Sequence, residues 1–493
     1  MNYASTRDKK MRMSAAQAIV RGLAPDGGLM TPEVLPRLPG SALETMKDMS
    51  YQQRVVYILS RFLDEFSARE LTSFAAAAYG GNFDTPAVSP VRQLKDGLSC
   101  LELWHGPTCA FKDMALQMLP HLLTASLTKT EEFKTVFILV ATSGDTGKGA
   151  LAGFRDVPRT KILVFYPKDG VSQVQQLQMV TQEGENVGVA AVQGNFDDAQ
   201  TGVKRLFSDE ALRQTLAEKG YFFSSANSIN WGRVLPQIVY YVSAYCDLLR
   251  DEKITAGQSI HVCVPTGNFG NILAAYYARE MGVPISRLIC ASNSNNVLTD
   301  FIRTGVYDRN RTFYNTMSPS MDILISSNLE RLLLSLTQDV DEVKGYMKEL
   351  NASGRYQVRD AVREKIQKLF CGYCCDNRET QRVIGEVYEK YQYLIDPHTA
   401  VAVSALEQYR AETGDGTPCV VVSTASPFKF CDSVLGALGE REIAPGLDAL
   451  DQLSQKTGLP APAPLASLRN KPVRFTREVA REHMEDAVLS MLE

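Results

Sequence analysis

The chain has 493 residues, of which 45% are hydrophobic and 22% are charged, and its formal net charge is -4. This is the balance of a globular protein, and so small a net charge gives no electrostatic reason to expect a nucleic acid as partner. No apolar run approaches the ~18 residues that a membrane-spanning helix needs. We expect two or three packed domains and small-molecule chemistry.

The first ~85 residues show mainly helical periodicity. Lys9 and Lys10 resemble the basic start of a signal peptide, but Gln17 breaks the apolar stretch behind them and Arg21 closes it. We therefore interpret the segment as mature sequence of a cytoplasmic protein. A link rich in glycine and proline, 80–90, ends this part of the chain.

After this link the pattern changes to strand, loop and helix. Unbroken β-branched and apolar runs alternate with amphipathic stretches, as in βα units whose parallel strands are buried on both faces. The predicted strands are 136–142, 161–166, 187–192, 259–264, 288–291 and 419–424, and the predicted helices are 148–154, 172–181, 197–207 and 272–279. The sequence therefore predicts an α/β protein with a parallel sheet.

The later part of the chain is read as helical over 341–393, with a proline-rich linker at 460–464 before a short C-terminal helix. Cys371, Cys374 and Cys375 form a C-x-x-C cluster near a predicted turn, where a metal or redox site can form. No second C-x-x-C and no histidine pair lies at zinc-ligand spacing. We assign this cluster no function.

The segment H-G-P-T-C-A-F-K-D places Lys112 in apolar surroundings where a loop meets a helix. Desolvation disfavours the ammonium form, so such a lysine can present the neutral amine that attacks an aldehyde. A surface lysine paired with Asp113 at a helix start is the ordinary alternative, and the local sequence alone favours it.

The segment P-T-G-N-F-G-N, 265–271, lies between a predicted strand and a predicted helix. Glycines there let the backbone approach a ligand, and free N–H groups with the helix dipole favour a phosphate. The loop lacks the G-x-G-x-x-G spacing of dinucleotide-binding loops and the lysine of a Walker loop. It is a moderate phosphate signal, with an ordinary αβ turn as the alternative.

The segment A-T-S-G-D-T-G, 141–147, follows the first predicted strand, at the edge where open α/β sheets bind ligands. Its hydroxyl and N–H donors are suited to a carboxylate. Lys148 follows, but Thr142 stands where a Walker motif needs its first glycine, and Gly149 stands where it needs Ser or Thr. Nucleotide hydrolysis is therefore disfavoured.

The segment S-S-A-N-S-I-N-W-G-R, 224–233, gathers neutral hydrogen-bonding side chains around Arg233 and suits a small anion. A polar loop capping a helix that begins near Leu235 is the alternative. The segment D-P-H-T, 396–399, predicts a helix start capped by its aspartate. The segment V-S-T-A-S-P, 422–427, ends the last strand, and each of these two is ambiguous alone.

Together these segments resemble threonine synthase, a family of pyridoxal-phosphate enzymes related in fold to tryptophan synthase β and cysteine synthase. Seven motifs appear in the family's order: A-P-D-G-G-L, H-G-P-T-x-A-F-K-D, S-G-D-T-G, S-A-N-S-I-N-W-G-R, G-N-F-G-N, D-P-H-T-A and T-A-S-P-x-K-F. They span almost the whole chain. Departures are small: Cys109 and Met114 flank the lysine, and Ser426 stands where some members carry His.

The resemblance implies a three-layer αβα parallel-sheet fold, like that of tryptophan synthase β, with a helical N-terminal domain. It divides the chain into an N-terminal domain (1–90), a large cofactor-binding domain (91–130 and 222–450), a small α/β domain (131–221) and a C-terminal linker and helix (451–493). It also implies a monomer or a homodimer without nucleic-acid, membrane or metal partners.

Position by position, the resemblance makes Lys112 the residue that binds the aldehyde of pyridoxal 5'-phosphate as a Schiff base. Thr424 would contact the pyridine nitrogen, where a neutral hydroxyl makes a milder electron sink than an aspartate would. The cradle of the cofactor phosphate would be Gly267, Asn268, Phe269, Gly270 and Asn271. We expect Lys112, this loop and Thr424 to converge on one pocket.

The resemblance also suggests how a substrate is held. The residues facing its carboxylate would be Ser143, Asp145 and Thr146. The candidates for its phosphate are Asn227, Asn230 and Arg233.

The implied reaction converts O-phospho-L-homoserine and water into L-threonine and phosphate, with the freed Lys112 amine moving protons at Cα and Cβ. A related phospho-lyase, which eliminates phosphate without making threonine, would have much the same sequence. A non-catalytic small-molecule sensor and a dinucleotide-dependent oxidoreductase are alternatives from other classes, and the glycine spacing disfavours the oxidoreductase.

Overall fold

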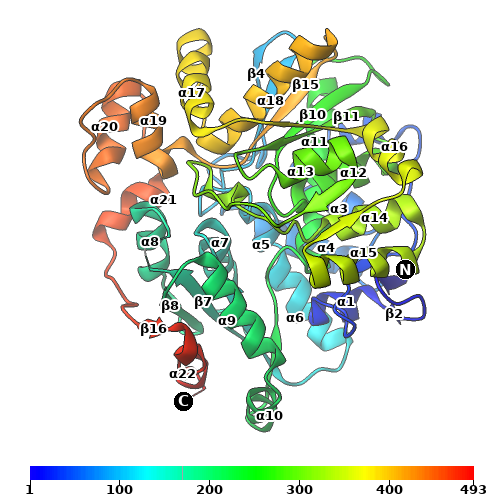
Figure 1. The fold of residues 1–493 in the computed structure, drawn as a ribbon, viewed down its shortest axis with the longest axis vertical. Helices are drawn as coiled ribbons and strands as arrows, with labels where there is room; N and C mark the ends of the chain where they lie inside the picture. Colours follow the sequence, from blue (N-terminus) through cyan, green and yellow to red (C-terminus); the bar gives the residue numbers. More distant parts are fainter. Residues whose placement is uncertain (169, 493) are drawn as a thin grey trace.

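A six-stranded sheet organises the larger part of the molecule in the computed structural model, which describes residues 1–168 and 170–492 (Figure 1). Its strand order is β14-β11-β10-β15-β5-β4. The strands are β4 (Val91–Lys95), β5 (Leu98–Glu102), β10 (Ile260–Pro265), β11 (Ile285–Ser292), β14 (Phe370–Cys374) and β15 (Cys419–Ser423). Neighbours are parallel except β4, which is antiparallel to β5. The predicted parallel sheet is thus confirmed.

Side chains of this sheet alternate between two hydrophobic cores. On β10, Val262 and Val264 belong to the core that contains α11 (Trp231–Arg250) and α12 (Gly270–Met281), whereas Cys263 belongs to the core beneath α18 (Pro397–Thr413). Successive strand residues point to opposite faces, so helices cover the sheet on both sides. This is the predicted three-layer αβα arrangement.

Further helices complete this unit. They are α13 (Val297–Thr304), α14 (Leu329–Thr337), α15 (Val340–Ser353), α16 (Asp360–Leu369), α17 (Asn377–Tyr391), α19 (Cys431–Ala437) and α20 (Asp448–Thr457). A two-stranded antiparallel sheet, β12 (Val306–Asp308) with β13 (Arg355–Gln357), lies among them.

The prediction of helix throughout 341–393 is wrong at β13 and β14. The three residues of β13 are too few to show a strand period, and the F-C-G-Y-C run of β14 contains a glycine and no β-branched residue. Cys371 and Cys374 lie on β14. Within the described residues, no group of three or more His, Cys, Asp or Glu side chains is arranged to hold a metal ion.

A second, all-parallel sheet lies below the first in Figure 1, with the strand order β16-β8-β7-β6-β9 in the described part of the chain. Its strands are β6 (Thr135–Ala141), β7 (Thr160–Pro167), β8 (Val187–Gln193), β9 (Tyr221–Ser224) and β16 (Glu478–Ala480). Its helices are α7 (Asp145–Phe154), α8 (Gln173–Val180), α9 (Phe196–Ser208) and α10 (Glu210–Glu218). On β6, Val136 and Ile138 face one core while Phe137 faces another, so this sheet is also buried on both sides.

The N-terminal part is helical as predicted, but it also contains a small antiparallel sheet in the order β2-β1-β3. The strands are β1 (Tyr3–Ser5), β2 (Arg12–Met13) and β3 (Met30–Pro32), and the helices are α1 (Ala15–Arg21), α2 (Ala42–Met46), α3 (Tyr51–Leu59) and α4 (Ala68–Tyr79), followed by α5 (Asp113–Leu116) and α6 (Leu119–Lys129). Strands of two or three residues give no recognisable alternation, which explains why the prediction missed them.

The C-terminal segment connects the two sheets. From α20 it continues through α21 (Ala463–Ala466) and a 3-10 turn (Ser467–Asn470) to strand β16, which pairs with β8. A second 3-10 turn (Arg481–His483) then leads into α22 (Met484–Leu489). It is drawn in red along the lower left of Figure 1. The segment is therefore more than the predicted linker and helix, while the division of the chain into four domains stays a prediction.

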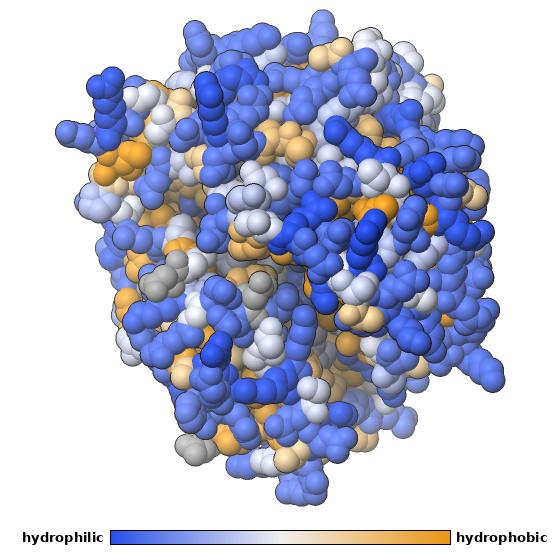
Figure 2. All heavy atoms as spheres, viewed as in Figure 1, coloured by the Kyte–Doolittle hydropathy of each residue, from blue (hydrophilic) through white to orange (hydrophobic). Residues whose placement is uncertain are grey.

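The face drawn in Figure 2 is largely hydrophilic, with apolar side chains in scattered small patches. None of the described helices combines the length and the apolar character needed to cross a bilayer.

Candidate active site

Lys112 lies at the end of an extended loop that is tied to the end of strand β15. The Phe111 N–H donates to the Thr424 carbonyl oxygen at 2.7 Å. Ala110 and Ala425 form an isolated antiparallel bridge beside this bond. The backbone of the lysine loop and that of Thr424 are therefore in direct contact, as the resemblance to a cofactor-binding family requires.

The environment of Lys112 favours a neutral amine. The side chain is only partly exposed, and burial lowers the pKa of its amine to about 8. The guanidinium of Arg233 and the ammonium of Lys429 lower this pKa further, whereas the carboxylate of Asp145 raises it. A substantial fraction of the amine is therefore unprotonated near neutral pH, which suits attack on an aldehyde.

Asp113 does not pair with Lys112, which removes the ordinary alternative of a surface ion pair. Its carboxylate accepts hydrogen bonds from the N–H of Thr108 at 2.8 Å and from the Thr108 hydroxyl at 2.7 Å. Burial raises the pKa of Asp113 to about 6, although these hydrogen bonds oppose the shift. Asp113 fixes the loop that leads to Lys112.

Acylation of Lys112 in the cofactor-free, full-length protein is expected to rise with pH and to reach half its maximum near pH 8. Below that pH the amine is protonated, and its reactivity falls about tenfold per pH unit. Competitive labelling with acetic anhydride, quantified at Lys112 by peptide mass spectrometry, measures the midpoint. A midpoint at the ordinary lysine value of about 10.4 would contradict a desolvated site.

The glycine loop 267–271 opens at the same edge of the large sheet. Strand β10, which precedes it, pairs in parallel with β15, which precedes Thr424. Since parallel neighbours end at one edge, the loop and Thr424 lie side by side. Phe269 has a φ of +64° and α12 begins at Gly270, so the loop turns sharply into the helix N-terminus.

The surroundings of this loop contain polar groups that suit an anion. Asn328 donates its N–H to the Asn268 carbonyl oxygen at 3.1 Å, and Asn271 Oδ1 accepts from Tyr240 and Tyr241 at 2.6 and 2.5 Å. The Nδ2 atoms of Asn271 and Asn328 are buried without a hydrogen-bond partner. Unpaired buried donors are costly, and a phosphate in the cradle would satisfy them. The residues therefore fit the phosphate group of pyridoxal phosphate.

Gly267→Ala is expected to weaken cofactor binding at least about tenfold, or ~1.4 kcal/mol. A Cβ at this position would lie 2.7 Å from the backbone carbonyl oxygen of Ser320, so the loop or its neighbour must shift. Equilibrium titration of cofactor-free protein measures the loss. Gly345→Ala is the matched control, because a Cβ there meets no atom within 4 Å, and unchanged affinity in both variants would contradict a tight cradle.

Ser143, Asp145 and Thr146 lie at the start of α7. This helix packs closely against Lys112, because a Cβ atom added at Gly149 would lie only 3.4 Å from the Lys112 Cβ. Burial alone would raise the pKa of Asp145, but the ammonium of Lys429 lowers it to about 2. An ionised carboxylate repels a substrate carboxylate. Ser143 and Thr146 therefore remain our proposed ligands for that group, and Asp145 needs another role.

Asn230 is the N-cap of α11, which begins at Trp231 rather than near Leu235. Its Oδ1 accepts from the Gly232 N–H at 2.9 Å. Its Nδ2 donates to the carbonyl oxygens of Ile19 and Ser225 at 3.0 and 3.1 Å. The amide is thus satisfied by the protein, and the structure does not offer it to a substrate phosphate.

Arg233, in the first turn of α11, is different. Its guanidinium is buried, it donates to the Ala226 carbonyl oxygen, and its Nε has no partner. Among the described residues it forms no ion pair. Burial lowers its pKa to about 10, so it stays charged at neutral pH. Arg233 therefore offers a binding group for an anion near Lys112. The unpaired atom of Asn227 is its Oδ1, which only accepts hydrogen bonds, so Asn227 stays a candidate only through its amide N–H groups.

The sequence reasoning gave no role to two residues of this region, Lys429 and His398. Lys429 lies five positions after Thr424 within P-F-K-F, and a lysine inside an apolar run was the available signal. His398 belongs to the predicted helix start, where the Asp396 N-cap is confirmed. Its Nδ1 bonds Asp396 at 2.6 Å, and its Nε2 accepts from the Ser320 N–H at 3.1 Å.

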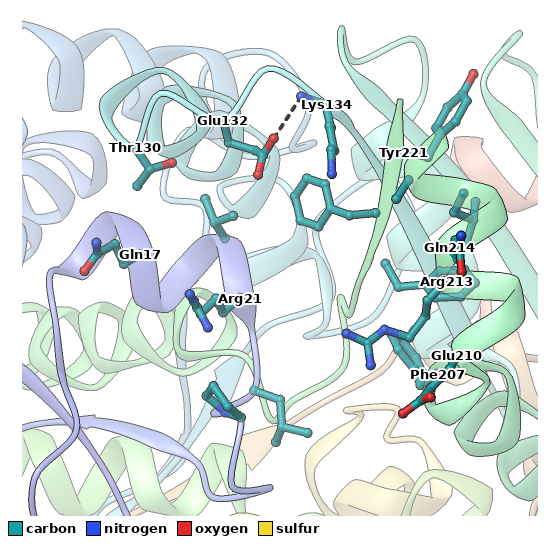
Figure 3. A pocket seen from close by; sticks show the side chains of 17 residues that line it. Gln17, Arg21, Thr130, Glu132, Lys134, Phe207, Glu210, Arg213, Gln214 and Tyr221 are labelled. Carbon is teal, nitrogen blue, oxygen red and sulfur yellow. Dashed lines mark hydrogen bonds between the residues drawn. The ribbon is translucent and has the colours of Figure 1, made fainter. Parts of the chain in front are cut away.

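A cavity of about 900 Å³ lies elsewhere, between α1, β9 and α10 (Figure 3). Arg21, Lys134, Glu132 and Arg213 are among the residues that line it, and it includes none of the predicted site residues. The chemistry of the residues around Lys112, and not this cavity, therefore indicates the candidate active site.

Comparison with known proteins identifies the family. Three family models match: "Threonine synthase N terminus" over residues 2–79, "Pyridoxal-phosphate dependent enzyme" over 83–425, and "Threonine synthase, C-terminal" over 399–487. The crystal structure of pyridoxal-phosphate-bound threonine synthase from Brucella melitensis is 34% identical and superposes with a TM-score of 0.88, covering 100% of both chains. The yeast threonine synthase structure is 33% identical with a TM-score of 0.89, over 100% of this chain and 98% of that chain.

Curated relatives point to the same family. Threonine synthase from Pseudomonas aeruginosa is 39% identical over 436 residues, which are 88% of this chain and 90% of that protein. Human "Threonine synthase-like 1" is 41% identical over 450 residues, 88% of this chain, and the match spans 60% of the human protein's length. The chain therefore belongs to the threonine synthase family of enzymes that depend on pyridoxal 5'-phosphate.

Proposed function

We propose that the chain converts O-phospho-L-homoserine and water into L-threonine and phosphate, with its cofactor bound at Lys112. The observation that carries this proposal is the buried Arg233, which has no ion-pair partner among the described residues and lies close enough to lower the pKa of the Lys112 amine. A site with a nucleophilic amine and an unpaired guanidinium suits an amino acid that bears a phosphate. Relatives named threonine synthase, 35–39% identical, support the same reaction.

We further propose how the chain holds the cofactor. Lys112 would bind its aldehyde, the loop Gly267–Asn271 would hold its phosphate, and Thr424 would face its ring nitrogen. When bound, the cofactor supplies an electron sink that stabilises negative charge developing on substrate carbon atoms. Thr424 suits a mild sink, because its hydroxyl carries no charge to keep the ring nitrogen protonated.

The remaining residues would bind and orient the substrate. Ser143 and Thr146, at the N-terminus of α7, would donate to its carboxylate, where the helix dipole favours negative charge. Arg233, with Asn227 beside it, would hold the phosphate before and after it leaves Cγ. Lys112 Nζ would take protons from Cα and Cβ so that phosphate can leave Cγ, since the pKa of this amine, about 8, lets it hold or release a proton near neutral pH. After Cγ is protonated, water would add at Cβ and the proton would return to Cα.

Elimination of phosphate without threonine formation is the second candidate. Relatives from human, macaque, orangutan and mouse carry the name "Threonine synthase-like 1" and are 40–41% identical, slightly more than the threonine synthases. The contacts that carry our proposal would serve either reaction, because both begin with proton removal at Cα and Cβ and loss of phosphate from Cγ.

Supplying O-phospho-L-homoserine to the cofactor-loaded enzyme is expected to yield phosphate and threonine in equal amounts. Phosphate can be followed colorimetrically and threonine by chromatography of the same samples. Phosphate accompanied by a keto acid and no threonine would refute the synthase and support the lyase. Absence of both products would refute both reactions.

A further inference from the structure

Asp145 and Lys429 form a buried ion pair between the two parallel sheets. Asp145 begins α7 of the smaller sheet, whereas Lys429 lies in a 3-10 turn (Pro427–Phe430) just after β15 of the large sheet. Lys429 Nζ is 2.7 Å from Asp145 Oδ1, and the side chains are 0% and 4% exposed. The pair is therefore shielded from solvent and joins the two halves of the site.

Lys429 also holds the loop that carries Lys112. Its Nζ donates to the Thr108 carbonyl oxygen at 2.9 Å. Thr108 in turn donates hydrogen bonds to the carboxylate of Asp113, the residue after Lys112. One ammonium thus connects the end of β15, the lysine loop and α7.

Asp145 is held from the other side as well. Gln175 of α8 donates to its Oδ1 at 2.9 Å, and the Ser320 hydroxyl donates to its Oδ2 at 3.4 Å. The loop of Ser320 is fixed by His398 and faces Gly267. Asp145 is the point at which segments from both sheets meet.

We propose that Lys429 is a positioning residue that holds ionised Asp145 and the Lys112 loop together and thereby sets the charge around the Lys112 amine. This role rests on the proposed function only in that Lys112 is the cofactor lysine. It also gives Asp145 a task that agrees with its charge, because the carboxylate balances Lys429 and opposes Arg233 near Lys112 instead of meeting a substrate carboxylate.

The groups around Lys112 predict opposite effects for the two partners of the pair. Arg233 on α11 and Lys429 after β15 lower the pKa of the Lys112 amine, while Asp145 on α7 raises it. Removal of a nearby positive charge stabilises the ammonium form, and removal of a nearby negative charge destabilises it. An ion pair that supports the fold but lies too far from Lys112 to act on its charge would produce no such signed response.

The test is the pH midpoint of Lys112 acetylation in full-length, cofactor-free protein, which requires no substrate. Lys429→Met is expected to raise the midpoint by about one pH unit, Asp145→Asn is expected to lower it, and the double variant is expected to return toward the wild-type value. Lys429→Arg, which keeps the charge, is expected to stay within about 0.3 units of wild type. If Lys429→Met does not fold, Asp145→Asn and Lys429→Arg still test the sign.

Asp247→Asn is the matched control. Asp247 pairs with the buried Arg54 at 2.7 Å, with side chains 8% and 2% exposed, and it lies on α11 roughly 21 Å beyond Arg233 at 1.5 Å per residue. It is expected to lower the melting temperature as the Asp145 variant does while leaving the Lys112 midpoint unchanged. Midpoints that stay unchanged in Lys429→Met and Asp145→Asn would overturn the proposal. A wild type that makes no threonine but shows these shifts would refute the proposed reaction alone.

Discussion

Lys112→Ala is expected to abolish turnover of O-phospho-L-homoserine, with kcat reduced by about 10⁴-fold or more. The substitution removes both the amine that would bind the cofactor and the base that would move protons at Cα and Cβ. Phosphate release under saturating substrate measures the loss. Borohydride reduction of the wild type, followed by peptide mass spectrometry, is expected to place the cofactor mass on Lys112.

Lys148→Ala is the matched control for this result. Lys148, which lies on α7, is another lysine whose pKa is lowered by burial, to about 7. Its Nζ donates to the side-chain oxygen of Gln182 at 2.6 Å. A low pKa alone would therefore select either lysine, whereas only Lys112 lies on the loop joined to Thr424. Reduced cofactor found on Lys148, or turnover retained by Lys112→Ala, would contradict the assignment.

Arg233→Met is expected to lower kcat/KM by about 10²- to 10³-fold, the size of one or two lost charge-assisted hydrogen bonds to a phosphate. The same change is expected to leave the melting temperature of the cofactor-free protein unchanged or higher, because a buried guanidinium without an ion-pair partner costs desolvation energy. Steady-state kinetics and differential scanning calorimetry measure the two effects. A residue that only supports the fold would show the reverse, with lower stability and normal kcat/KM.

Arg54→Met is expected to show this reverse pattern of lower stability with normal kcat/KM. Arg54 is also buried, but it pairs with Asp247 and donates to Ser243 at 2.6 Å. Breaking this pair leaves Asp247 with fewer partners and is expected to cost about 3 kcal/mol of stability, with kcat/KM per folded molecule unchanged. If Arg233→Met and Arg54→Met change kcat/KM and stability in the same way, Arg233 does not bind the substrate phosphate.

Much of the fold could be predicted because its signals are local. Strands β6, β7, β8, β10, β11 and β15 were recognised as unbroken apolar runs, since parallel strands between two helical layers are buried on both faces. The predicted cap at Asp396 was equally local, because a carboxylate there accepts from the first free N–H groups of α18. The strands β1, β2, β3 and β13 were missed because two or three residues show no recognisable period. Strand β14 is as long as β15, but its sequence F-C-G-Y-C contains a glycine and no β-branched residue.

The candidate site also has features that the sequence predicts and features that only the structure reveals. The sequence by itself determined the family, because seven motifs occur in the family's order within one chain. From the same motifs it predicts the cofactor lysine, the glycine loop and the segment that contains Arg233. Only the tertiary structure decided what each charged group meets. Asp113 is bound by Thr108 rather than Lys112, Asn230 is used as a cap, and Asp145 is paired with Lys429. The pair of Asp145 and Lys429 forms only when two separate sheets pack against each other. Burial then fixes which charges stay paired and which, like Arg233, remain open to a ligand.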